Sequence, residues 1–238
     1  MDTADRHTTS ADLDSVFAAT RRRFALSQEV VYLNGNSLGP LTHDVRARVA
    51  DEIDMQWGPR LINGWNESGW MDLSQTAGDK IAALVGAPAR SVAVCDSTSV
   101  NLFKVLSAAL EMQPDRRVVL SDSSNFPTDL YVAQELLGKL GRGHGLKIVA
   151  PEEVAEAIDE SVAVLMLTEV DYRTARLHDM AALTQRAHDA GALTIWDLTH
   201  SAGALPVHLE EAGKSRDATR AARAGSGKNC EPANPVTR

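Results

Sequence analysis

The alternation of short apolar stretches with amphipathic segments is the feature of this sequence that most restricts its fold. Arg117–Leu120, Leu146–Val149 and Val162–Leu167 are rich in strand-forming residues, and a segment with helical spacing follows each of them. Val162–Leu167 is apolar throughout, which is typical of a strand buried on both faces of a parallel sheet. The pattern predicts an α/β domain with a mostly parallel sheet between two layers of helices.

Two further strands and seven helices complete the expected order of elements. The additional strands are a short buried one at Val92–Cys95 and one at Leu193–Trp196. The expected helices are those at 12–24, 45–57, 72–84, 99–110, 128–140, 152–158 and 179–189. Functional residues in such a sheet belong at the C-terminal ends of the strands.

The composition narrows the class of protein. Across 238 residues, 24 Lys and Arg face 32 Asp and Glu, a net charge of −8 that argues against binding to a nucleic-acid backbone. The two cysteines, Cys95 and Cys230, do not form a disulfide framework, which fits a reducing compartment. The longest strongly apolar run is far shorter than the roughly 18 residues of a membrane span. We therefore expect a cytoplasmic protein with no nucleic-acid or membrane partner.

The last segment differs from the rest of the chain. Residues 214–238 hold six Lys and Arg against two Asp and Glu, so they carry +4 and residues 1–213 carry −12. They contain no Leu, Ile, Met, Phe, Trp or Tyr, too little apolar surface to offset the entropy of ordering. Two interpretations stay open: a disordered tail, or a reading frame that changes near Gly213. We divide the chain into an N-terminal helical segment (1–60), a large domain (61–213) and this tail (214–238).

The first candidate site group follows the expected strand at Val92–Cys95. Thr98 and Ser99 stand where this strand turns into a helix, so their hydroxyl groups and the free backbone N–H groups of the first helical turn suit a phosphate. The alternative is ordinary capping of the helix by a Ser or Thr side chain.

The second group follows the strand at Arg117–Leu120. Phe126 is an aromatic residue on a loop beside Asp129, and such a pair is able to stack on a planar cofactor and to order its edge. The alternative is a plain helix start, with Pro127 in the first turn and Phe126 as a hydrophobic staple.

The third group follows the strand at Leu193–Trp196. Asp197 closes an apolar strand, where a buried carboxylate is costly unless it meets a cation or several donors. A protonated pyridine nitrogen is one such cation, and His200, three residues later, is placed to hold a second group. The alternative is an Asp197 satisfied by backbone donors and an exposed His200. Asp197 and His200 supply only two metal ligands, so we predict no metal site.

Together these groups resemble the kynureninase family of fold-type I pyridoxal-phosphate enzymes. The matching stretches run in order from Tyr32 to Leu209 and are Tyr32–Pro40, Gly64–Trp70, Ser97–Leu102, Asn125–Asp129, Asp171–Thr174 and Asp197–Ala204. Ala175 departs from the family pattern, which leads us to expect glycine there. The resemblance implies a fold-type I large domain with a mostly parallel sheet that is incomplete at the C-terminus, and a homodimer.

The resemblance also implies a role for each candidate residue toward pyridoxal 5'-phosphate (PLP). Thr98 and Ser99 would hold the phosphate, and Phe126 would stack on the ring. Asp129 would lie near the ring hydroxyl, and Asp197 would pair with the pyridine nitrogen. Two further contacts to the cofactor are expected from Thr168 and His200. Ser37 and Trp65 would approach the substrate.

The implied activity is that of a PLP-dependent hydrolase acting on C–C bonds. It would convert L-kynurenine, or its 3-hydroxy derivative, to anthranilate or 3-hydroxyanthranilate and L-alanine, in tryptophan degradation and NAD biosynthesis. The lysine that binds PLP as a Schiff base is not found where the family has it, because the lysines after Leu209 are Lys214 and Lys228, in the tail. We therefore predict no catalytic residue here and an inactive chain. The alternatives are a non-catalytic PLP-binding remnant and another fold-type I enzyme, such as a cysteine desulfurase-like protein.

Overall fold

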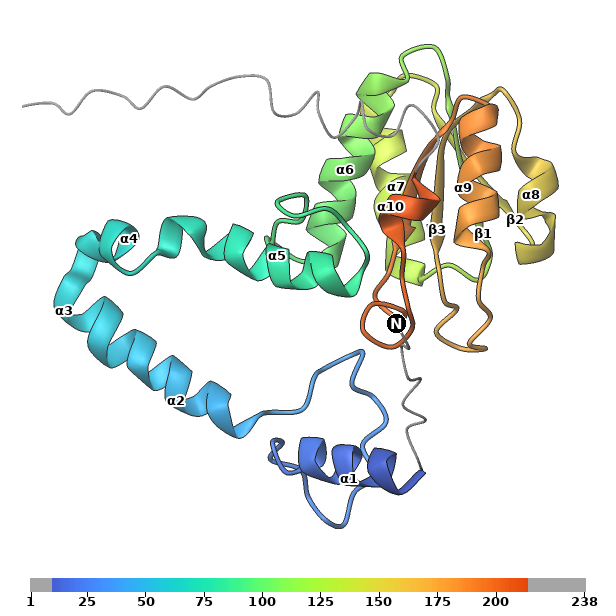
Figure 1. Cartoon of the computed structure of the whole chain (residues 1–238). Coiled ribbons are helices and arrows are strands. Elements are labelled where there is room, and N and C mark those ends of the chain that lie inside the picture. The colour runs from blue at the N-terminus through green and yellow to red at the C-terminus, as the bar shows by residue number, and fades with distance from the viewer. Residues whose placement is uncertain (1–9, 214–238) are drawn as a thin grey trace, which may run out of the picture. The chain divides into compact units, whose positions relative to one another are not determined.

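The computed structural model describes residues 10–213, and the expectations for the tail at 214–238 lie outside the described residues. The chain divides into two compact units, the first ending at Leu73 and the second beginning at Ser74. Figure 1 shows the elements of both units.

The second unit is built on a parallel sheet of four strands in the order β2-β1-β3-β4 (Figure 1). The strands are β1 (Val118–Asp122), β2 (Gly145–Val149), β3 (Val162–Thr168) and β4 (Leu193–Asp197). Every residue of β3 is buried, as its unbroken apolar sequence predicts. The predicted α/β fold with a mostly parallel sheet is confirmed.

Helices cover both faces of this sheet. The helices of the second unit are α5 (Leu73–Leu84), α6 (Thr98–Met112), α7 (Pro127–Leu140), α8 (Val154–Ala157), α9 (Met180–Asp189) and α10 (Leu209–Ala212), with a 3-10 turn at Pro151–Glu153 before α8. Successive side chains of β3 point to opposite faces. Val164 and Met166 therefore pack with α6 and α7, whereas Leu165 and Leu167 pack with α8 and α9.

The prediction of a strand at Val92–Cys95 is wrong. The segment is irregular, and Val94 is 44% exposed rather than buried. Its carbonyl groups accept hydrogen bonds from α5 side chains: Ser74 Oγ donates to Val94 O at 2.7 Å and Gln75 Nε2 donates to Val92 O at 3.1 Å. A short apolar run becomes a strand only beside a neighbour that completes its backbone hydrogen bonds, and the described residues place no such strand there.

The first unit consists of short helices. They are α1 (Ser10–Arg21), α2 (His43–Asp51), a π-helical turn (Glu52–Trp57), α3 (Gly58–Arg60), a 3-10 turn (Leu61–Asn63), α4 (Gly64–Glu67) and a 3-10 turn (Trp70–Asp72). The helix expected at 45–57 is confirmed, with its second half wound as a π-helix. The regular elements from α2 to the last 3-10 turn bury one residue, Gly64.

Candidate functional site

The C-terminal ends of β1, β3 and β4 bring the candidate residues of the second unit to one edge of the sheet. Asp122, Thr168 and Asp197 are the last residues of these three strands, and Thr168 is the register partner of Asp197. In open α/β sheets ligands bind at this edge, where loops follow the strands. The loops after β1, β3 and β4 carry aromatic and imidazole groups to the same edge.

Two carboxyl groups meet at this edge. Asp129 lies in the first turn of α7 and is 2% exposed. Burial, and after it the charge of Asp197 and a hydrogen bond between the two side chains, raise the pKa of Asp129 to about 7. Asp197 Oδ1 also accepts a hydrogen bond from Thr199 N at 2.7 Å. Since two close carboxylates repel each other, the pair holds either a proton or an external cation.

A cavity of about 600 Å³ opens at these carboxyl groups. Thr98, Asp129, Asp197 and Thr199 give it polar walls, and the rest of the lining is mostly apolar, including Trp196. Its size falls within the roughly 300–1,000 Å³ of small-molecule sites. A mostly apolar cavity with a few convergent polar groups is the usual form of a cofactor site.

The N-terminus of α6 supplies one wall of the cavity. Ser97 is the N-cap, because its side chain accepts a hydrogen bond from Val100 N at 3.4 Å, and Thr98 and Ser99 are the first two residues of the helix. The capping alternative thus holds for Ser97, the residue before the two phosphate candidates. The N–H groups of a first helical turn lack intrahelical acceptors and attract anions.

Three rings gather next to this edge from three loops. Phe126 lies 5.0 Å from Tyr172, edge to face, and the two rings lie 6.2 and 6.1 Å from His200. His200 Nδ1 is buried and has no hydrogen-bond partner among the residues that the structure describes. A buried polar atom without a partner is costly, so a ligand that bonds to it would be favoured.

Thr168 reaches the loop after β1 through Asn125. Its buried hydroxyl group donates to Asn125 Oδ1, which also accepts from Phe126 N at 2.7 Å. Asn125 Nδ2 donates to Ser121 Oγ at 2.9 Å and to Met166 O at 3.2 Å. The structure therefore places Thr168 against Asn125, and not in the lining of the large cavity. Its expected contact with a cofactor stays a prediction.

Sequence reasoning did not place Asn125, Tyr172, Asp122 or His178 in the candidate site, and it interpreted His178 and Asp179 as the cap of a helix. Asn125 and Tyr172 lie within the motifs shared with the kynureninase family, so their position was a usable signal. His178 precedes a helix that Asp179 caps through a hydrogen bond from Ala182 N at 3.0 Å. Nothing in the local sequence indicates that His178 binds Asp122.

The substrate candidates Ser37 and Trp65 belong to the first unit. Ser37 Oγ donates to Asn34 Oδ1 at 2.7 Å, and the Trp65 ring lies 5.8 Å from that of Trp70, nearly perpendicular to it. Their expected contacts with a substrate stay predictions.

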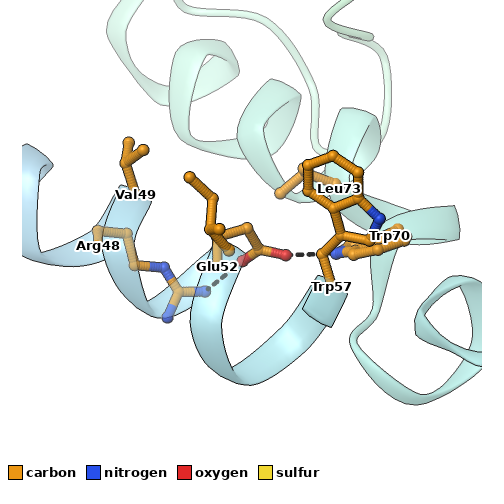
Figure 2. Close-up of a pocket in the computed structure, with 7 residues that line it drawn as sticks. Arg48, Val49, Glu52, Trp57, Trp70 and Leu73 are labelled. Carbon is orange, nitrogen blue, oxygen red and sulfur yellow. Dashed lines mark hydrogen bonds and ion pairs between the residues drawn. The ribbon is translucent and has the colours of Figure 1, made fainter. Parts of the chain in front are cut away.

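The first unit has an apolar pocket of its own, of about 580 Å³ (Figure 2). Its apolar walls are Val49, Ile53, Trp57, Trp70 and Leu73. Glu52 also lines the pocket. Its carboxylate accepts a hydrogen bond from Trp70 Nε1, and its Oε2 lies 3.7 Å from Arg48 Nη2. Because Glu52 is thus neutralised, the pocket presents mainly apolar surface.

Two absences apply to residues 10–213. No group of three or more His, Cys, Asp or Glu side chains is arranged to hold a metal ion there. Within the same range, no helix has the length and apolar character required to cross a membrane.

Solved structures define the class of the fold. The chain superimposes on a NifS-like protein (TM-score 0.63, 15% identity, 76% of this chain and 52% of that one) and on C-DES with glycine covalently linked to its PLP cofactor (0.67, 14%, 80% and 52%). A cysteine desulfurase from Thermococcus onnurineus NA1 matches with a TM-score of 0.62 at 19% identity, over 82% of this chain and 50% of that one. The fold is that of the fold-type I PLP enzymes.

Sequence comparison narrows this class. The chain is 51% identical over 207 residues to the kynureninase of Pseudomonas fluorescens, covering 85% of this chain and 50% of that protein. It is 47% identical over 206 residues to the kynureninase of Burkholderia mallei strain SAVP1, covering 84% and 50%. No protein-family model matches. The chain is a homologue of the kynureninases, as its motifs predict, and it spans about half the length of the curated relatives it matches.

Proposed function

We propose that this chain forms the PLP-binding part of a kynureninase. The observation that carries the proposal is the Asp129–Asp197 pair, two carboxyl groups in hydrogen-bond contact on the wall of a cofactor-sized cavity. A protonated pyridine nitrogen supplies the cation that this pair lacks. Identities of 47–51% to kynureninases, against 14–20% to the solved structures with the same fold, favour kynureninase chemistry.

The residues present would contact PLP at four points, although Ser99, Phe126 and His200 lie outside the lining of the cavity. Asp197 would face the ring nitrogen, Asp129 beside it would lie near the ring hydroxyl, and Phe126 would stack on the ring. Thr98 and Ser99 would bind the phosphate at the N-terminus of α6, where the helix dipole favours negative charge. His200 Nδ1, which is buried and unpartnered in the described part of the chain, would bond to the phosphate or to a ring substituent.

The reaction of the whole protein would be hydrolysis of L-kynurenine or 3-hydroxykynurenine to anthranilate or 3-hydroxyanthranilate, respectively, and L-alanine. When bound, PLP supplies an electron sink for this cleavage. Asp197 would keep the ring nitrogen protonated, and Phe126, from the loop after β1, would stack on the ring. None of the lysines at 10–213 lines the cavity, so we propose that this part of the chain binds PLP reversibly and does not turn over substrate by itself.

We further propose that the protein is a cytoplasmic homodimer that acts in tryptophan degradation and NAD biosynthesis. The first unit supports the dimer, because its apolar side chains stay exposed along one run of helices. Val49, Ile53 and Trp57 are 53%, 49% and 60% exposed and recur at helical spacing. Large exposed apolar patches mark interaction surfaces. Trp65, whose ring packs against Trp70 in the lining of the same pocket, would then lie near an interface.

Titration of the full chain with PLP tests the proposal. We expect saturable quenching of tryptophan fluorescence, because Trp196 lines the cavity, and we expect dialysis to reverse it. Asp197→Ala should weaken binding strongly, whereas Asp189→Ala, which changes an acidic residue at the end of α9, should leave binding intact. With kynurenine added, no anthranilate fluorescence should develop. A folded chain that shows no saturable binding would contradict the proposal.

A further inference from the structure

Two loops at the C-terminal edge of the sheet contact each other at two points. One loop follows β1 and carries Phe126, and the other runs from the end of β3 to α9 and carries Tyr172 and His178. At the base, His178 Nε2 lies 2.7 Å from Asp122 Oδ2, and the two side chains are 8% and 3% exposed. At the tip, the Phe126 and Tyr172 rings pack edge to face at 5.0 Å.

The contact at the base orders the start of the first loop. Asp122 Oδ1 accepts a hydrogen bond from Ser124 N at 2.7 Å, while Oδ2 contacts His178. A buried carboxylate that loses one of its partners pays the full cost of desolvation. His178 therefore holds Asp122, and Asp122 in turn holds the backbone that leads into Phe126.

The second loop is organised by its own bonds. Asp171 accepts hydrogen bonds from Arg173 N and Thr174 Oγ1, both at 2.8 Å, and Val170 bridges Leu177 in antiparallel fashion. Tyr172 therefore lies in a turn that these bonds close, and the turn fixes the backbone that bears its ring. Because this turn is bonded independently of the first loop, it is able to act as the support for that loop.

We infer that the Asp122–His178 pair and Tyr172 position the Phe126 ring for its stack on the cofactor. The inference rests on the proposed function, since it concerns the same PLP site. The three side chains act through Phe126 and are positioning residues. The pair sets the direction in which the loop leaves β1, and Tyr172 sets the tilt of the Phe126 ring. A ring held in place before binding loses less entropy when the cofactor stacks on it.

The first test measures the loop without any cofactor. In the full chain, His178→Ala should raise hydrogen exchange at the amides of Ser124 and Phe126 by about tenfold, since a hydrogen bond to a charged group is lost. His178→Gln, which keeps a donor near the Nε2 position, should restore most of the protection. Exchange at Leu165, in the middle of β3, should not change. Unchanged exchange at Ser124 and Phe126 would overturn the inference.

The second test measures PLP affinity. His178→Ala should weaken binding about tenfold, and His178→Gln should recover it. Tyr172→Ala should weaken binding about fivefold through the lost ring contact, and Tyr172→Phe should bind as the unmodified chain does. Tyr172 is 43% exposed, so this pair of variants keeps the test decisive if His178→Ala fails to fold. Unmodified chain that binds no PLP refutes the proposed function, whereas equal affinity of all variants refutes only the positioning role.

Discussion

The Asp129 carboxyl group gives the site a pH dependence that a single substitution removes. Burial and the neighbouring Asp197 raise its pKa from 3.8 to about 7, so the folded chain holds a proton that the unfolded chain releases. The resulting stability is fully present below the ordinary pKa of 3.8 and is lost as the pH rises through about 7. Asp129→Asn should lack this loss of stability, because the asparagine side chain does not titrate.

Denaturant unfolding at several pH values, in the absence of cofactor, measures this effect. The free energy of unfolding of Asp129→Asn relative to the unmodified chain should increase between about pH 4 and pH 8. Asp115→Asn, an acidic residue in the turn between α6 and β1, serves as the control and should show no such increase. Parallel stability curves for Asp129→Asn and the unmodified chain would contradict the shared proton.

Ala175 occupies a backbone conformation that suits glycine. Its φ angle is 58°, in the left-handed region, where a Cβ atom costs about 1–2 kcal/mol. The family resemblance leads us to expect glycine there, and the turn of the Tyr172 loop gives the physical reason. Relief of this strain in Ala175→Gly should raise the free energy of unfolding by about 1 kcal/mol. The greater backbone entropy of glycine in the unfolded chain reduces this gain. A lower melting temperature for Ala175→Gly would contradict this prediction.

At the level of helices, the close approach of α5 to the segment at Val92–Cys95 depends on Gly78. A Cβ atom at Gly78 would lie 1.9 Å from Val92 O, a backbone atom that no side-chain rotation removes. Gly78→Ala should destabilise the chain by about 1–3 kcal/mol, as overpacking of a core does. Denaturant unfolding followed by circular dichroism measures the change.

Gly138 in α7 is the matched control for this prediction. It also lies inside a helix, but a Cβ atom there meets nothing within 4 Å. Gly138→Ala should therefore stabilise the chain by about 0.5–1 kcal/mol through helix propensity. Equal effects of the two substitutions would show that helix propensity, and not the contact with Val92, decides the outcome at Gly78.

For the molecule as a whole, the proposed dimer depends on the apolar face of the first unit. Ile53→Asp and Trp57→Asp place charges on that face and should convert a dimer into monomers, as sedimentation equilibrium measures. Met55→Asp is the control, because Met55 is 60% exposed and apolar but does not line the pocket of Figure 2. A chain that is monomeric without any substitution would refute the dimer.

The sequence by itself determined the elements between residues 117 and 197 and the similarity to the kynureninases. The strands and helices predicted there appear within a few residues of their expected ends, because their patterns are local: apolar runs, helical spacing and caps such as Asp179. The kynureninase resemblance is equally local, since it depends on short motifs in order. The prediction of a strand at Val92–Cys95 failed because a strand also needs a neighbouring strand, which the local sequence pattern does not specify.

Only the tertiary structure decided which distant side chains meet. Asp129 and Asp197 share a hydrogen bond, and Asp122 bonds to His178 across 56 positions of sequence, because the order β2-β1-β3-β4 places the ends of β1, β3 and β4 at one edge. Neither contact can be predicted from the spacing of residues in the local sequence. Burial then sets their chemistry, since low polarity and a second carboxyl group, not the residue type, raise the pKa of Asp129.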